Sequence, residues 1–146
     1  MKKVISILAT SLIMLSSYAA NNNEIDSYIK KAFTFRFPNA THVRFEKGDN
    51  SVMISFIENN RLRLAAFRED GKYIGTGFFM KTEEIPAALL FSLEKQFGHP
   101  EIIQSMEFIP VQEQSYYGFR LNTETESILV RVYDSGETEV INREKR

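Results

Sequence analysis

The sequence predicts an α+β protein built from two tandem repeats, each a helix followed by a four-stranded antiparallel meander, with the helices packed on one face of the sheet. Two observations predict this fold. Apolar residues at helical spacing begin at Ile25 and again at Ile85, and each run is followed by short segments of alternating polarity. A hairpin signal, Asp70-Gly71 after such a segment, returns in weaker form as Asp134-Ser135-Gly136.

Residues 1–19 have the order of a secretory signal peptide. Two lysines precede an apolar run from Val4 to Leu15, and small residues follow it. The run is shorter than the roughly 20 residues that span a bilayer, so we expect cleavage after Ala19 and no permanent membrane anchor. The predicted location is the periplasm or the medium.

The composition after this cut limits the partners and the chemistry. The remaining chain carries 16 basic and 19 acidic residues, a net charge of −3, and no cysteine. A nucleic-acid-binding domain usually shows a clustered basic excess, so we expect no nucleic-acid partner. Without disulfides, an exported domain must be stabilised by its core.

The first repeat is expected at residues 20–81. Ile25, Ile29, Phe33 and Phe37 mark a helix with Asn23 as its N-cap. The predicted strands are residues 42–47, 51–57, 61–67 and 72–80.

The second repeat is expected at residues 82–146, forming one compact unit with the first. Pro86 suits the first turn of a helix that continues to Phe97. The predicted strands are residues 102–108, 116–121, 127–133 and 137–142. Counting from helix to turn places Phe67 and Tyr133 at equivalent positions.

Three short motifs carry a family resemblance. Phe37-Pro38-Asn39-Ala40 leading to Val43-Arg44-Phe45 resembles the helix-to-strand junction of the PepSY-like, or β-lactamase-inhibitor-like, exported proteins. The turn at residues 67–72 and the helix start at Ile85-Pro86 resemble elements of the same family. The resemblance implies two helix-plus-sheet repeats and, as in the best-known members, a concave sheet that grips another protein. It brings no catalytic residues with it.

Catalytic and metal sites find little support in the sequence. A Ser-His-Asp set would need His42 or His99, and these are more simply a strand start and a helix stop. Glu69-Asp70 lacks the alternating oxygen ligands of a calcium loop and is more simply a solvated turn. We therefore predict no enzyme activity, no catalytic residues, no metal and no cofactor.

Side-chain alternation along the strands predicts a binding face. Leu62, Leu64 and Ala66 are expected to face the helices, as are Ile128, Val130 and Val132, and Tyr117, Phe119 and Leu121. The helix-free face would then carry the partner-binding residues, which are Arg44, Arg61, Arg63, Phe67, Tyr116, Arg120, Arg131 and Tyr133. Arg and Tyr are enriched at binding hot spots, although such residues also occur on ordinary solvated sheets.

The sequence therefore predicts an exported, non-enzymatic protein-binding module. Its partner would be another extracytoplasmic protein, such as a peptidase or other hydrolase that the module restrains. The alternative is a periplasmic carrier that holds a small ligand or a cell-envelope fragment between the repeats.

Overall fold

The computed structural model describes residues 25–146, so the predicted signal peptide and Asn23 lie outside the described part of the chain. Both predicted helices and all eight predicted strands are present. The elements are α2 (Ser27–Arg36), β1 (Thr41–Lys47), β2 (Ser51–Glu58), β3 (Arg61–Arg68), β4 (Tyr73–Phe79), α3 (Ala87–Phe97), β5 (Glu101–Pro110), β6 (Tyr116–Asn122), β7 (Glu126–Tyr133) and β8 (Thr138–Lys145). A short 3₁₀ helix, η3 (Thr82–Glu84), precedes α3.

The strands form an antiparallel sheet in which their order follows the sequence, which confirms the α+β class. The described residues group into two compact units. The first comprises residues 25–78 with 110–113, and the second comprises residues 79–109 with 114–146.

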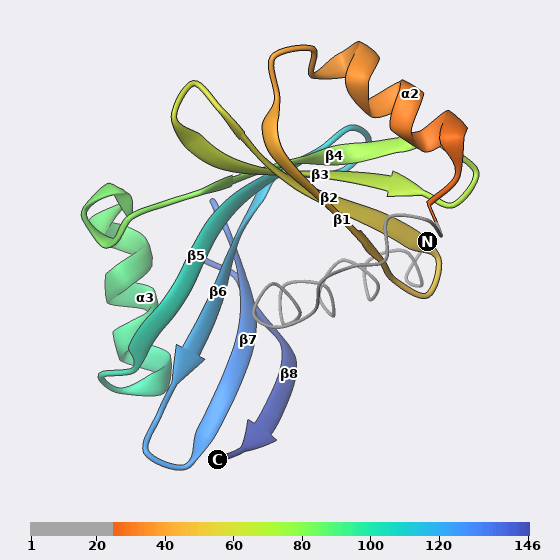
Figure 1. Cartoon of the computed structure of the whole chain (residues 1–146). Coiled ribbons are helices and arrows are strands. Elements are labelled where there is room, and N and C mark those ends of the chain that lie inside the picture. The colour runs from red at the N-terminus through yellow and green to blue at the C-terminus, as the bar shows by residue number, and fades with distance from the viewer. Residues whose placement is uncertain (1–24) are drawn as a thin grey trace. The chain divides into compact units, whose positions relative to one another are not determined.

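In the first unit, α2 lies across the strands β1 to β4 (Figure 1). Its buried side chains include Ile29 and Phe33, which recur one turn apart and so share a face. The core beneath them consists of Val52, Ile54, Phe56, Ala65 and Phe67, with Ile25 and Phe37 at the ends of the helix. Phe56 packs closely with Phe33 and Phe37, at ring-centroid distances of 5.1 and 4.8 Å. The core of this unit is therefore largely aromatic.

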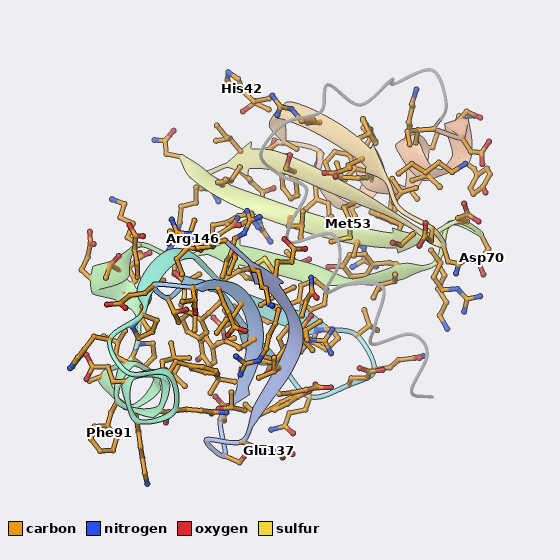
Figure 2. All side chains as sticks on the ribbon, turned by 90° about the horizontal axis from the view of Figure 1, so that it is seen from below. His42, Met53, Asp70, Phe91, Glu137 and Arg146 are labelled. Carbon is orange, nitrogen blue, oxygen red and sulfur yellow. The ribbon has the colours of Figure 1, made fainter. Side chains whose placement is uncertain are left out.

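In the second unit, α3 packs on the sheet through Leu89 and Leu93. The core on the sheet side consists of Phe119, Leu121, Ile128, Val130 and Val132. Each of these strand residues was predicted to face the helix, and that prediction is confirmed. Phe91 lies on the opposite side of α3 and points into solvent (Figure 2).

The helix starts differ slightly from the prediction. Asp26, not Asn23, occupies the N-cap of α2, and its side chain makes no capping hydrogen bond. Pro86 is the N-cap of α3 rather than a residue of its first turn. The Tyr28 hydroxyl of α2 donates a hydrogen bond to the carbonyl of Glu69, which ties the helix to the turn between β3 and β4.

A tight turn sets the register between β2 and β3. Asn59 and Asn60 both have positive φ, 53° and 59°, which is the backbone of a two-residue hairpin turn. Glu58 therefore pairs with Arg61, and Phe56 with Arg63. Because directly paired residues share a face of the sheet, Arg63 lies on the side of Phe56 and of α2.

Candidate functional site

The structure divides the eight predicted binding residues between the two faces of the sheet. Those on the helix-free face, as predicted, are Arg44, Tyr116, Arg120, Arg131 and Tyr133. Those on the helix-covered face, against the prediction, are Arg61, Arg63 and Phe67. The predicted inward set Leu62, Leu64 and Ala66 is wrong for the same reason, since it faces away from α2.

Phe67 belongs to the core beneath α2. Its side chain is 1% exposed, and its ring centroid lies 5.4 Å from that of Tyr73. It pairs with Val52, another residue of that core. Phe67 is therefore a packing residue and is inaccessible to a partner.

Arg63 is held by aromatic rings and by one carboxylate. Its guanidinium carbon lies 4.6 Å from the ring centroid of Phe78 and 5.4 Å from that of Phe37. It also forms an ion pair with Glu58, and burial lowers the pKa of the guanidinium. These contacts stabilise the edge of the core and leave Arg63 with a structural role.

The second unit brings three of the predicted residues together on its helix-free face. Tyr116 pairs with Tyr133 across β6 and β7, and their ring centroids lie 6.2 Å apart. The Arg131 guanidinium carbon lies 4.6 Å from the centroid of the Tyr116 ring. Arg131 is 3% exposed, so this charge is buried in the sheet face.

Glu139 joins this group from β8, and the sequence prediction missed it. Its carboxylate lies 3.8 Å from Nη1 of Arg131 and accepts a hydrogen bond of 3.2 Å from the Tyr133 hydroxyl. Glu139 pairs with Arg131 across β7 and β8. Counting back from the turn after Tyr133 would have found this pair, because hairpin register follows from the turn.

Tyr133 and Glu139 are the accessible members of the cluster formed by Tyr116, Arg131, Tyr133 and Glu139. Tyr133 is half-buried, and burial and the Glu139 carboxylate raise the pKa of its phenol, against an opposing effect of Arg131. The phenol therefore remains a hydrogen-bond donor at neutral pH. Arg120 lies half-buried on the same face, one strand away on β6.

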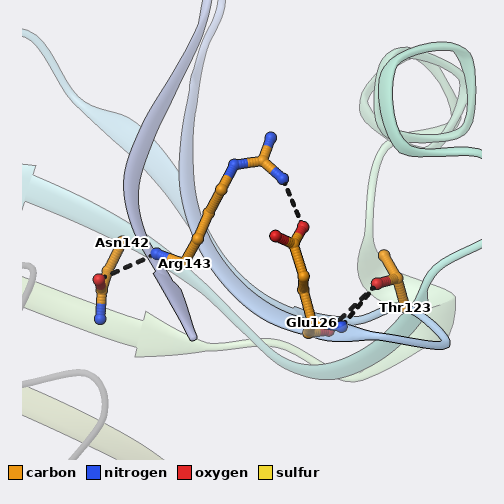
Figure 3. A network of polar contacts seen from close by, with 4 residues as sticks. All are labelled: Thr123, Glu126, Asn142 and Arg143. Carbon is orange, nitrogen blue, oxygen red and sulfur yellow. Dashed lines mark hydrogen bonds and ion pairs between the residues drawn. The ribbon is translucent and has the colours of Figure 1, made fainter. Parts of the chain in front are cut away.

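A second polar network fixes the other end of this unit (Figure 3). The Glu126 carboxylate forms an ion pair of 2.7 Å with Arg143, and the Glu126 amide donates to the Thr123 hydroxyl at 3.1 Å. The Arg143 amide donates to the Asn142 side-chain oxygen at 2.9 Å. These contacts join the turn between β6 and β7 to strand β8, and their partners are all within the chain.

In the first unit, Arg44 is exposed on the helix-free face of β1 and Glu46 is half-buried beside it. Burial raises the pKa of the Glu46 carboxyl, and the Arg44 charge opposes this effect. The folded protein therefore holds this proton to higher pH than the unfolded chain does. Stability from this group is present at low pH and is lost as the pH rises through the raised pKa.

Glu46→Gln is expected to stabilise the protein at pH 7 by up to about 0.5 kcal/mol, and to leave stability unchanged near pH 3.5, where the carboxyl is protonated. Urea unfolding of both proteins at the two pH values measures this difference. A variant that is less stable than the parent at pH 7 would show that the carboxylate has a favourable partner.

The two histidines lie in different units and are both exposed. His42 has a positive φ of 52° at the start of β1. His99 follows the end of α3, and its Nδ1 lies 3.8 Å from Oε1 of Glu94. Among residues 25–146, no three His, Cys, Asp or Glu side chains are grouped so that they could hold a metal ion. No helix in this part of the chain is long and apolar enough to cross a membrane.

Comparison with known proteins identifies the fold. No protein-family model and no curated protein matches the sequence. Several solved structures resemble the chain in shape, among them three from Bacteroides species. A DUF2874 family protein from Bacteroides uniformis ATCC 8492 has a TM-score of 0.68 at 12% identity, over 82% of this chain and 88% of its own.

The second is a protein from Bacteroides eggerthii DSM 20697 that is described provisionally as periplasmic. It has a TM-score of 0.68 at 14% identity, over 88% of this chain and 90% of its own. The third is a BLIP-like protein from Bacteroides fragilis NCTC 9343. It has a TM-score of 0.62 at 12% identity, over 82% of this chain and 85% of its own. At these identities the likeness is one of fold alone, and the chain shares its fold with DUF2874 and BLIP-like proteins.

Proposed function

We propose that this protein is a non-enzymatic binding module that acts outside the cytoplasm and docks another protein on the helix-free face of its second unit. The observation that carries the proposal is that Tyr133 is both partly exposed and held in a fixed position. This half-exposed aromatic side chain is held by Glu139 and Tyr116 and lies on the same face as Arg120. The location is supported by the predicted signal peptide and by the fold shared with a protein described provisionally as periplasmic.

Pre-organisation is the physical reason to favour this face. A tyrosine that is already fixed by a hydrogen bond and a ring contact loses little conformational entropy on binding. Tyr and Arg contribute much of the binding energy at protein interfaces when they lie near the centre of the contact. Arg131 is a buried member of the cluster, so it positions Tyr116 and Glu139 rather than contacting the partner.

The partner in this proposal is an extracytoplasmic peptidase or other hydrolase, which the module would restrain. The fold shared with a BLIP-like protein supports this class of partner. The tandem-repeat organisation belongs to the same proposal. It is supported by two turns that share the same hydrogen-bond pattern. The Gly71 amide donates to the Arg68 carbonyl, and the Gly136 amide donates to the Tyr133 carbonyl.

The test compares two variants of the protein as bait for the native organism's envelope fraction, followed by titration of the purified partner. Tyr133→Ala combined with Arg120→Glu is expected to weaken binding of that partner at least about tenfold, since both changes alter half-buried side chains of the proposed contact face. Arg61→Glu is the matched control, because this exposed arginine belongs to the first unit and lies on its helix-covered face.

Equal binding by the double variant and the parent would assign the contact to another surface. If no envelope protein captured by the parent binds the parent again after purification, the proposed binding function itself is wrong.

A further inference from the structure

One large apolar side chain on the first helix stands almost entirely in solvent. Phe35 of α2 is 91% exposed, whereas Ile29 and Phe33 of the same helix are buried. Lys31 lies one turn before Phe35 and is also exposed. The two side chains therefore share the outer face of α2.

The charges on this helix are all of one sign. Lys30, Lys31 and Arg36 are basic, and α2 contains no acidic residue. The Arg36 guanidinium lies 3.8 Å from the ring centroid of Tyr73, which fixes its position at the C-terminal end of the helix while the residue remains exposed. Lys31 and Arg36 thus flank Phe35 with positive charge.

The acidic groups near α2 gather at its other end. Asp26, Glu69 and Asp70 act on Tyr28, where burial and these carboxylates raise the pKa of the phenol. Because a residue advances about 1.5 Å along a helix, Phe35 lies roughly 10 Å beyond Tyr28. The positive potential is therefore concentrated on the C-terminal half of α2.

The two units also differ in net charge. Residues 25–78 and 110–113 contain nine Lys and Arg and seven Asp and Glu, a net charge of +2. Residues 79–109 and 114–146 contain seven Lys and Arg and eleven Asp and Glu, a net charge of −4. Only the unit that carries α2 has the sign that attracts an anionic surface.

The surroundings of Phe35 favour a lipid surface over a protein surface. The exposed residues nearest to it within α2, Lys31, Thr34 and Arg36, are polar, so the helix places no second apolar side chain directly beside the ring. The centre of a protein interface normally combines several apolar side chains in a patch of about 800 Å². A single protruding aromatic ring between cations instead suits the headgroup boundary of an anionic bilayer, where the ring inserts and the cations meet phosphates.

We propose that the C-terminal half of α2 is a peripheral membrane-binding site for anionic phospholipids. Phe35 enters the boundary between headgroups and acyl chains, and Lys31 and Arg36 contact the phosphate groups. The binding is weak and reversible, because one aromatic side chain and two or three cations provide less than a membrane-spanning segment does. It would hold an exported protein at the membrane surface.

The test measures binding of the chain from Ala20 to Arg146 to sedimented phosphatidylglycerol–phosphatidylcholine vesicles at low ionic strength. The parent is expected to bind, and 0.5 M NaCl and pure phosphatidylcholine vesicles should each abolish most of the binding. Phe35→Ser is expected to lower the partition coefficient about tenfold, and Lys31→Glu about thirtyfold. Circular dichroism should show both variants folded.

Phe91→Ser is the matched control, because Phe91 is also exposed on a helix but belongs to the negatively charged unit. It should bind vesicles as the parent does. The proposal is overturned if the parent does not bind anionic vesicles, or if Phe35→Ser and Phe91→Ser bind equally. A third outcome also overturns it. If the parent self-associates but does not bind vesicles, and Phe35→Ser no longer self-associates, the occupant of this site is a second copy of the chain.

Discussion

Phe67→Ala is expected to lower the free energy of unfolding by about 3–5 kcal/mol. The Phe67 ring is buried between α2 and the sheet, together with Val52 and Ala65. Removing it would leave a cavity that the aromatic side chains around it can fill only in part. Since small domains are stable by only about 5–15 kcal/mol, this is a large share of the total. Urea unfolding followed by circular dichroism measures the change.

Phe35→Ala is the control for this prediction. It makes the same chemical change at the exposed position on α2 and is expected to alter stability by no more than about 0.5 kcal/mol. If the two variants lose the same small amount, Phe67 lies on an accessible face, as the sequence had suggested. If Phe67→Ala alone is strongly destabilised, its side chain is part of the core.

The elements themselves could be predicted because each has a local signal. The spacing of Ile29, Phe33 and Phe37 marks a helix, and the Asp70-Gly71 pair marks a turn, whatever the rest of the chain does. These signals located both helices and all eight strands. The helix-facing residues of β6 and β7 were also found. In β7, Ile128, Val130 and Val132 form an apolar set, whereas the alternate set contains Ser127 and Arg131.

The facing of β3 could not be found in the same way, because both sides of this strand are buried. Leu64 and Ala66 are as inaccessible as Ala65 and Phe67, so alternation in hydrophobicity does not distinguish the faces. The information lay in the neighbouring turn instead. A two-residue turn at Asn59-Asn60 pairs Phe56 with Arg63 and thereby places Phe67 beneath α2.

The cluster of Tyr116, Arg131, Tyr133 and Glu139 was predicted only in part for a related reason. Tyr116, Arg131 and Tyr133 were placed on the correct face, but Arg131 was taken as accessible when it is buried. A long side chain can lie flat along a sheet over an aromatic ring, and its sequence position alone does not show this. The acceptor Glu139 comes from the next strand, so it becomes visible only once the register between β7 and β8 is known.

The equivalence of Phe67 with Tyr133 is wrong by one residue. In the first unit, the amide of Arg68 donates to Lys72 at 2.8 Å and that of Gly71 donates to Arg68 at 2.9 Å. In the second, the amide of Tyr133 donates to Glu137 at 2.9 Å and that of Gly136 donates to Tyr133 at 2.8 Å. Tyr133 therefore occupies the turn position of Arg68, which explains why it is half-exposed while Phe67 is buried.

These matched turns allow a second prediction with a built-in control. Gly71 and Gly136 have nearly the same backbone, with φ of 85° and 84°. Alanine at either position must adopt a left-handed backbone, which costs about 1–2 kcal/mol. At Gly136 nothing lies within 4 Å of the added methyl group, so Gly136→Ala should cost that amount alone.

Gly71→Ala is expected to cost about 1–2 kcal/mol more than Gly136→Ala. Its methyl group would lie 2.8 Å from Cδ2 and 3.0 Å from Cε2 of Tyr28, so the tyrosine ring must move. Because the Tyr28 hydroxyl donates to the carbonyl of Glu69, that movement also strains the bond that ties α2 to the turn. Chemical unfolding of the two single variants measures the excess.

The excess can be assigned to Tyr28 by a double-mutant cycle. In a Tyr28→Ala background the ring is absent, so Gly71→Ala should cost no more than Gly136→Ala does in the parent. If the excess persists without the ring, it arises from the backbone of the turn rather than from the helix. If it disappears, the turn between β3 and β4 and the helix α2 are coupled through this one side chain. That coupling would explain why the turn of the first unit requires glycine for two physical reasons, while the turn of the second requires it for only one.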